Sequence, residues 1–292
     1  MKKKIFSILI AAFTFAASGA FAQGYDLKEP FAVKAYGNIG LGSGMSLSSN
    51  AAMTHSSSLS SVGVDFSYIF WQQKGHSVAV SGGLSYDILS AKLDVAGMNY
   101  NYAAGSNADM DGNTYNRFYE ISGVEQKVGG GYVSVPIYAT YTYRFNEWIG
   151  VYASLGIKPG FKASGSSRSF RANVYSYGVY PEYGNLMMDD DWLNDFGRTS
   201  LSDGDVNKPE MSGFNMDFLM GFGAEAKISG PVYASLGFNY CAGVTNIYKK
   251  GDSKPLVTYT VADGQKSRSL TELLGKSKIS NFGLCIAVIY RF

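Results

Sequence analysis

The amino-acid sequence predicts an all-β fold: one up-and-down antiparallel β-barrel of about eight strands. Segments in which apolar and polar residues alternate recur along the chain, which is the pattern of strands with two different faces. The connections between these segments are alternately short and long. Aromatic residues make up 15% of the chain, which also contains 35 glycines and only 7 prolines. Together these features favour strands and turns over helices.

Eight segments alternate with a period of two. They span residues 32–42, 61–71, 77–89, 132–145, 148–158, 213–227, 231–246 and 279–292. In the second segment, for example, Val62, Val64 and Phe66 share one face, and the opposite face is small or polar. A soluble sandwich would bury the bulky face between two sheets, whereas a membrane barrel would turn it towards lipid. Alternation alone leaves both architectures open.

The lengths of the connections favour the membrane barrel. Three are tight turns, at residues 72–75, 146–147 and 229–230, and four are long, at about 45–60, 90–131, 159–212 and 247–277. Bacterial outer-membrane barrels have short periplasmic turns and long external loops. A compact soluble domain rarely contains several connections of that length. The sequence therefore predicts a transmembrane barrel with both termini in the periplasm.

The N-terminus has the pattern of a cleaved secretory signal peptide. Three lysines precede an apolar run from Ile5 to about Ala17, and the small-residue site Ala20-Phe21-Ala22 follows. The run of about 13 residues is too short for a membrane-spanning helix, the alternative interpretation. We predict a signal peptide over residues 1–22 and a barrel over residues 23–292, exported to the outer membrane. Losing the three lysines leaves a nearly neutral protein, so the precursor charge of +2 does not indicate a nucleic-acid partner.

The C-terminus ends in a strand pattern with an aromatic last residue. Phe292 has apolar residues two, four and six positions before it, which resembles the C-terminal signal of outer-membrane barrels. That resemblance implies the barrel assembly machinery as a partner. Aromatic residues also gather near the predicted tight turns, as expected for a girdle at a bilayer interface. These residues are Phe70, Trp71, Tyr143, Phe145, Trp148, Tyr290 and Phe292.

Short motifs resemble a known family. They are Tyr132–Pro136, Tyr141–Phe145, Gly243–Ile247 and Tyr290–Phe292. On these residues the chain is similar to the bacterial outer-membrane protein β-barrel family, often labelled porin-like, of the OmpA/OmpX type, over roughly residues 24–292. The resemblance implies a transmembrane barrel in the outer membrane of a Gram-negative bacterium, in contact with its lipid. It implies no activity.

One acidic stretch has the spacing of a calcium-binding loop. Asp109, Asp111, Asn113 and Glu120 occupy positions 1, 3, 5 and 12 of that pattern. Thr114 stands where the pattern needs glycine, and no flanking helices are evident, so a solvated acidic loop is the alternative. We expect no other cofactor, because the sequence has no phosphate-binding glycine motif and no CxxC pair.

The cysteines and histidines allow two further hypotheses. Cys241 and Cys285 fall on the inward side of adjacent segments, and would be close neighbours if Val232 faced Phe292. The exported compartment permits a disulfide, but adjacent antiparallel strands fit its geometry poorly, so two buried thiols are the alternative. His55 precedes three serines, and some outer-membrane barrels are enzymes that use a Ser and a His. No carboxylate can be assigned to it by spacing, and we predict that the chain is not an enzyme.

The predicted inner face carries nearly balanced charges. They are Lys34, Arg144, Lys158, Lys227 and Arg291, against Asp65, Asp87, Asp217 and Glu225. An eight-stranded barrel is only wide enough for side chains to fill, and buried charges must be paired. We therefore predict an internal salt-bridge network that plugs the lumen. In the competing interpretation, part of segment 113–128 adds a strand pair and opens a water path.

The predicted function is a structural or surface-interaction role carried by the long external loops. Loops on a rigid scaffold are where binding residues concentrate. Those at 90–131 and 159–212 contain eight tyrosines suited to a surface protein or glycan ligand: Tyr100, Tyr102, Tyr115, Tyr119, Tyr175, Tyr177, Tyr180 and Tyr183. A passive channel for small solutes and a lipid-directed enzyme are the alternatives.

Overall fold

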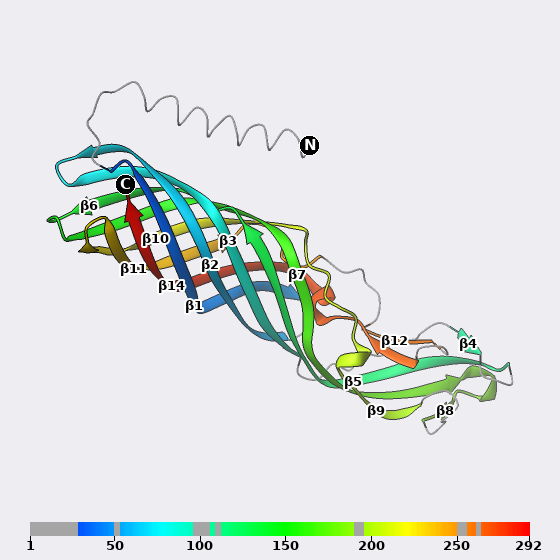
Figure 1. The fold of residues 1–292 in the computed structure, drawn as a ribbon. Helices are drawn as coiled ribbons and strands as arrows, with labels where there is room; N and C mark the ends of the chain where they lie inside the picture. Colours follow the sequence, from blue (N-terminus) through cyan, green and yellow to red (C-terminus); the bar gives the residue numbers. More distant parts are fainter. Residues whose placement is uncertain are drawn as a thin grey trace, which may run out of the picture.

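Eight strands close into one antiparallel ring (Figure 1). The computed structural model describes residues 29–49, 53–95, 106–108, 112–189, 196–249, 256–260 and 264–292. The ring consists of β1 (Phe31–Ser49), β2 (Met53–Gln73), β3 (His76–Val95), β6 (Ile137–Arg144), β7 (Ile149–Tyr180), β10 (Phe214–Ser229), β11 (Val232–Gly243) and β14 (Leu274–Arg291). Pairing of β7 with β10 and of β14 with β1 completes it. The predicted eight-stranded barrel is confirmed, whereas the predicted signal peptide lies outside the described residues.

The fourth strand of the ring is interrupted by a proline. β5 (Thr114–Ser134) pairs with the parts of β3 and β7 farther from the tight turns, and β6 pairs with the parts nearer to them. Val135 and Pro136 join β5 to β6. Proline cannot donate to the ladder, but its carbonyl still accepts a hydrogen bond from the Gly83 amide at 3.2 Å. β5 and β6 are therefore one strand with a local break, so the wider barrel considered from the sequence is wrong.

The three tight turns lie at the same end of the barrel as the start of β1 and the end of β14 (Figure 1). Lys74 and Gly75 have positive φ of 46° and 86°, the two-residue hairpin geometry that matches strand twist. Asn146 Oδ1 accepts hydrogen bonds from the amides of Trp148 and Ile149, both at 2.8 Å. Short turns, stabilised by a glycine or by a side-chain acceptor, therefore connect the strands at this end of the barrel, as the sequence predicts.

The last residue helps to close the ring. The Phe31 amide donates to the Phe292 carbonyl at 3.0 Å, and the Phe292 amide donates to the Phe31 carbonyl at 2.9 Å. The two aromatic rings lie 6.0 Å apart. Phe292 therefore joins the first and last strands through its backbone and through its side chain.

Deleting Phe292 should lower the fraction of folded barrel, because both closing hydrogen bonds and a ring contact are lost. The measurement is the amount of heat-modifiable protein in outer-membrane fractions. Phe292→Tyr, which keeps the backbone and an aromatic ring, should remain near the wild-type amount. Equal folded amounts for the truncated and full-length chains would contradict this role.

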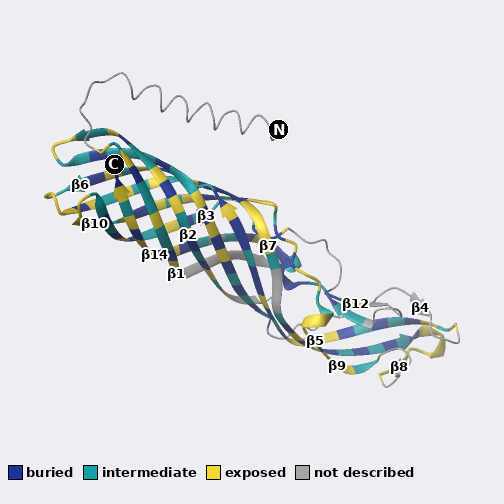
Figure 2. Cartoon of the chain, in the orientation of Figure 1, coloured by how far each residue is buried: buried dark blue, intermediate teal, exposed yellow. Residues whose placement is uncertain are grey.

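The outer wall of the barrel is apolar and is bounded by aromatic residues at both ends. Figure 2 shows exposed and buried positions alternating along the strands. Leu84, Leu155 and Leu236 expose 56–63% of their surface on this wall. Near the tight turns the exposed rings are Phe70, Phe145, Trp148, Tyr290 and Phe292, as predicted; the opposite border has Tyr86, Phe161, Phe214, Tyr240 and Phe282. Two such girdles around an apolar band are typical of membrane-spanning barrels.

The two faces exchange polarity beyond the second girdle. On β3, Leu84 and Ile88 are exposed on the outer wall, while Asp87 on the inner side is buried and paired. Further along the same strand, Leu89 and Leu93 on the inner side are fully buried, and the outer side becomes charged. An apolar interior with a polar exterior is the arrangement of a protein in water. The lipid-facing part of β3 therefore ends near Ile88.

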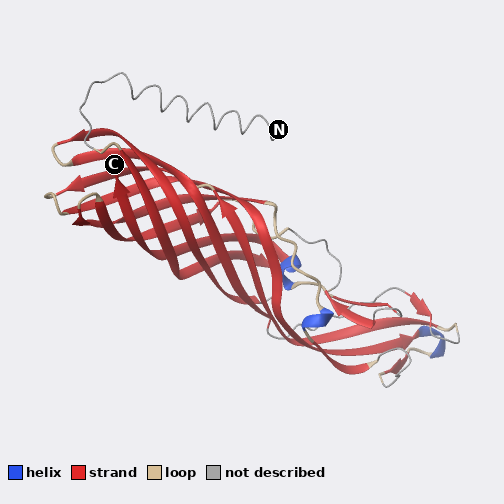
Figure 3. Ribbon diagram, viewed as in Figure 1, coloured by secondary structure: helices blue, strands red, loops and turns tan. Residues whose placement is uncertain are grey.

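The segments predicted as long loops are largely strand, so those loop boundaries are wrong. β7 has 32 residues, which at about 3.3 Å per residue is roughly 100 Å of chain, against a hydrocarbon core of about 30 Å. Together with β5 it continues past the barrel (Figure 3). The flanking elements are β4 (Ser106–Ala108), η1 (Pro181–Tyr183), β8 (Leu186–Met188), β9 (Gly197–Leu201), η2 (Asp203–Asp205), β12 (Val257–Thr260), β13 (Gly264–Ser267) and η3 (Leu270–Leu273). We call these eight flanking elements, together with the outer parts of β3, β5 and β7, the head.

The head has its own hydrophobic core. Its members are Leu93, Val95, Tyr119, Ile121, Val124, Phe170, Ala172, Val174, Leu201, Leu256, Val257 and Leu270. These side chains come from the barrel strands, from β9 and from the segments around β12 and η3, so packing rather than local propensity holds the extension in one shape. No helix in the described part of the chain is long and apolar enough to cross a membrane.

Candidate functional site

The lumen nearest the tight turns is occupied by one carboxylate and two guanidinium groups. Glu225 accepts from Arg144 at 3.2 Å and from Arg291 at 2.8 Å. Both guanidinium groups also lie over the Tyr233 ring, 5.0 and 4.5 Å from its centroid. Charge-assisted hydrogen bonds and cation–π contacts together compensate the burial of these charges.

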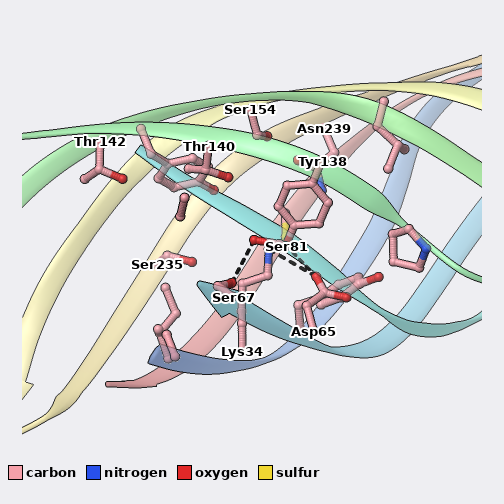
Figure 4. A pocket seen from close by; sticks show the side chains of 18 of the residues that line it. Lys34, Asp65, Ser67, Ser81, Tyr138, Thr140, Thr142, Ser154, Ser235 and Asn239 are labelled. Atoms are coloured by element: carbon pink, nitrogen blue, oxygen red, sulfur yellow. Dashed lines mark hydrogen bonds and ion pairs between the residues drawn. The ribbon is translucent and has the colours of Figure 1, made fainter. Parts of the chain in front are cut away.

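A second charged group lies deeper in the barrel (Figure 4). Lys34 Nζ is 3.4 Å from Asp65 and donates a hydrogen bond to the Tyr138 hydroxyl, which donates to Asp65 at 2.5 Å. These three side chains come from β1, β2 and β6, so they link strands across the lumen. They line a cavity of about 110 Å³ together with small hydroxyl side chains such as Ser67 and Ser81.

A third group crosses the lumen closest to the head. Lys158 Nζ is 3.0 Å from Asp87 and 3.8 Å from Asp217, and all three side chains are at most 5% exposed. Ser134 donates to Asp87 at 2.5 Å and Asn215 donates to Asp217 at 2.9 Å. One lysine therefore holds two carboxylates, each of which has a further hydrogen bond.

The predicted internal network is confirmed for eight of the nine inward charges, which form the three groups above. The ninth, Lys227, lies 6.0 Å from the centroid of the Tyr233 ring. The inward charges could be predicted from the alternation along each strand: if the bulky residues point outwards, the charged residues between them must point inwards.

An apolar cluster lies at the mouth of the barrel beneath the head, and we call it the mouth cluster. Its members are Leu59, Leu89, Ala91, Val128, Tyr132, Met211, Ile247, Tyr248 and Leu274. The Tyr132 hydroxyl donates to the carbonyls of Ser212 and Ile247 at 3.1 and 3.2 Å, which fastens the covering segments. A side chain at Gly130 would collide with Met211, so this glycine makes room for the methionine in the cluster.

One face of the head sheet is covered and the other is open. Alternate residues of β5 and β7, including Tyr115, Tyr119 and Val174, are buried. On the opposite side Phe118 stacks on Tyr177 at 5.3 Å, and Tyr175 lies 5.7 Å from Tyr177. We call this side, with Phe118, Tyr175, Tyr177, Arg198 and the residues that continue its line towards the barrel, the open face.

Hydrogen bonding fixes the edge of the open face. The Tyr175 hydroxyl donates to Asp189 at 2.5 Å, which raises the pKa of Tyr175, and the Arg198 guanidinium lies 5.8 Å from the Tyr175 ring centroid. The result is a row of half-exposed aromatic rings flanked by charges. Tyr175 and Tyr177 were among the loop tyrosines predicted for ligand contact. Phe118 and Arg198 were missed, because only the register places them beside these tyrosines.

The eight tyrosines proposed for ligand contact divide into different roles. Tyr115, Tyr119 and Tyr180 are buried and pack inside the head, so a surface role for them is wrong. Tyr175, Tyr177 and Tyr183 remain accessible. Tyr100 and Tyr102 lie outside the described residues.

The residues proposed for calcium are only partly described. Asp109 and Asp111 lie outside the described residues, Asn113 accepts a hydrogen bond from Tyr183 at 3.0 Å, and Glu120 is exposed on β5 opposite Tyr175. Within the described part of the chain, no three His, Cys, Asp or Glu side chains come together. The calcium site stays a prediction.

The cysteines are buried and free, and the register behind the disulfide hypothesis is wrong by two residues. Val232 pairs with Tyr290, Cys241 with Asn281 and Cys285 with Gly237. In this register the Arg291 amide donates to the Pro231 carbonyl, and Phe292 extends past β11 and pairs with Phe31 at the start of β1.

The histidines lie at opposite ends of the β2–β3 hairpin. His55 lies on β2 opposite Leu93, in the outer part of that strand. His76 begins β3 at a tight turn, where its Nδ1 is 2.5 Å from the Tyr141 hydroxyl.

Comparison with known proteins finds distant likenesses among solved structures. No family model and no curated protein matches the sequence. Ail of Yersinia pestis is 11% identical; the match covers 91% of this chain and 100% of Ail, with a TM-score of 0.33. OprG of Pseudomonas aeruginosa is 9% identical; the match covers 90% of this chain and 95% of OprG, with a TM-score of 0.38. Neisserial surface protein A is 10% identical; the match covers 90% of this chain and 97% of that protein, with a TM-score of 0.30. These likenesses concern the fold alone. With its closed ring, apolar outer wall and two aromatic girdles, the chain is an outer-membrane β-barrel protein.

Proposed function

We propose that this chain is a non-catalytic surface-interaction barrel, in which a plugged lumen anchors a rigid head that binds a surface protein or a glycan. The observation that carries this proposal is the open face. The head has a packed core on one side of its sheet, and the other side presents a row of aromatic rings to solvent. Aromatic side chains supply large contact area at low entropic cost, which suits a binding surface.

A photo-crosslinking experiment on intact cells tests the binding role. A benzophenone amino acid replaces Tyr177 on the open face or Tyr141 on the outer wall of the barrel. We expect the Tyr177 site to capture a surface protein or glycan that the Tyr141 site does not. The same captured products at both sites would reject the open face as the binding surface.

The charged groups and the apolar mouth support a closed lumen, in place of the passive channel that is the alternative. Three ion-paired groups lie in series between the tight turns and the mouth cluster. Ion-selective pores tend instead to have rings of one sign. We expect the purified, refolded protein to give no stable unit conductance in planar bilayers, with heat modifiability as proof of folding. A reproducible unit conductance would make the solute channel the leading function.

A further inference from the structure

A short apolar strand forms one edge of the head sheet, near the end farthest from the barrel. β8 pairs with residues 178–180 of β7, while β5 and β4 lie on the other side of β7; Figure 1 shows β8 close to the far end of the head. Within the described part of the chain, β8 pairs with no second strand. The outer edge of β8 therefore presents backbone groups to which another extended segment can pair.

All three side chains of β8 are large, apolar and exposed. Leu186, Met187 and Met188 expose 52%, 51% and 39% of their surface, and Tyr183 in the preceding turn exposes 57%. Successive residues of a strand point to opposite faces, so β8 is uncovered on both faces. Such residues bury little surface on folding, and contiguous exposed apolar patches mark binding surfaces. We call these four residues the tip.

Hydrogen bonds order the turn that leads into β8. The Tyr183 hydroxyl donates to Asn113 Oδ1 at 3.0 Å, and the Thr114 hydroxyl donates to Glu182 at 3.2 Å. Both contacts tie the turn to the start of β5. Gly184, with a positive φ of 69°, ends the 3-10 helix before β8. Because the turn is already ordered, binding at the tip costs less conformational entropy than binding by an unstructured loop.

The charges next to the tip in the chain are acidic. Glu182 precedes Tyr183, Asp189 follows β8, and both are exposed. In the sequence Asp189 is the first of three successive aspartates. The exposed cation Arg198 of the open face lies over the ring of Tyr175, 5.8 Å from its centroid. An acidic border attracts lysine and arginine side chains and repels anionic lipid headgroups.

The side chains of β8 suit a peptide better than a sugar. Leucine and methionine have no strong hydrogen-bonding group to match sugar hydroxyls, whereas methionine adapts to irregular apolar side chains and is enriched at protein interfaces. An extended peptide can pair with the free edge of β8 and contact both of its apolar faces, as in strand addition. Met187 pairs with Val179 of β7, on the side of the sheet that carries Tyr175 and Tyr177. The tip therefore adjoins the open face.

We propose that the tip binds an extended segment of a partner protein in which apolar residues are flanked by lysine or arginine. The apolar side chains of that segment contact β8 and Tyr183, and its cations contact Glu182 and Asp189. This inference rests on the surface-interaction role proposed above and assigns it a class of partner. Because β8 has only three residues, the backbone pairing is short, and the apolar and charged contacts supply most of the affinity.

Selection from a phage-displayed library of short random peptides tests the tip. The target is the full-length protein in lipid nanodiscs, after counter-selection on empty nanodiscs. We expect enrichment of peptides that combine apolar residues with lysine or arginine. The most enriched peptide should bind Leu186→Ser/Met187→Ser/Met188→Ser, the β8 variant, about tenfold more weakly than the wild type, because the apolar contact area is lost.

Two further variants separate charge from the mere change of surface. Glu182→Gln/Asp189→Asn keeps the hydrogen-bond acceptors for Thr114 and Tyr175 but removes the charges, and should weaken binding severalfold at low salt. The control variant replaces three exposed residues outside the tip and should bind as wild type: Lys208→Ser/Glu210→Ser/Lys249→Ser. Heat modifiability shows that each variant is folded.

Several outcomes would overturn the proposal. They are the absence of enrichment over empty nanodiscs, enrichment of acidic peptides, and equal binding by the β8 variant and the wild type. Vesicles of phosphatidylcholine and phosphatidylglycerol that bind the wild type but not the β8 variant would assign the tip to a membrane instead. If the tip fails in any of these ways, capture from the Tyr177 site on intact cells would still support the surface-interaction role, which distinguishes the two failures.

Discussion

Lys158→Met is expected to destabilise the barrel strongly. It leaves Asp87 and Asp217 buried on the same side of the lumen without their shared cation. Breaking a buried ion pair from one side costs about 3–5 kcal/mol, because a charge remains uncompensated. The measurement is the urea midpoint of refolded protein, followed by heat modifiability.

The control for Lys158→Met removes all three charges together. The triple variant Lys158→Met/Asp87→Asn/Asp217→Asn should recover most of the lost stability, because no net buried charge is left. Ser134 and Asn215 can still hydrogen-bond the new amides. A single variant as stable as the wild type would mean that water or ions reach the lysine site freely.

Leu236→Arg is the second substitution with a large expected effect. Leu236 pairs with Ile286, midway along β11 between residues that pair with the two aromatic girdles. Arginine on the lipid face near the bilayer midplane costs about 2–4 kcal/mol. We expect a large fall in the amount of folded barrel recovered from outer membranes.

A matched substitution in the head separates lipid contact from mere exposure. Leu186 on β8 is 52% exposed and Leu236 is 56% exposed, yet the head lies beyond the second girdle. Leu186→Arg should therefore leave barrel yield unchanged. Equal losses for the two variants would contradict the assigned membrane level.

Sequence periodicity predicted the barrel well and the head poorly, for one physical reason. In lipid, the bulky residues of a strand face outwards and the charges inwards, and this parity correctly placed Val64, Asp65 and Lys158. Beyond Ile88 water replaces lipid, so the same alternation has the opposite meaning. Leu89 and Leu93 still point inwards, but the inward positions are now apolar instead of polar. A search of the sequence for an outward apolar face therefore ends each strand too early.

Long-range register was the other quantity that local patterns could not supply. β11 and β14 are separated in sequence by residues 244–273, so their register is not set by a tight turn between them. A shift of two residues preserves every inward and outward assignment, so the alternation of Leu236 or Ile286 cannot detect it.

The unbroken length of β7 also has a mechanical consequence. This strand runs from the tight turn at residue 149 to the far end of the head at residue 180, and it is hydrogen-bonded to β6 or β5 along nearly all of that length. A load applied to the head along the strand would act on those hydrogen bonds in shear, many at once, instead of opening them one after another. Tension on the head would then be transmitted directly to the strands that span the membrane.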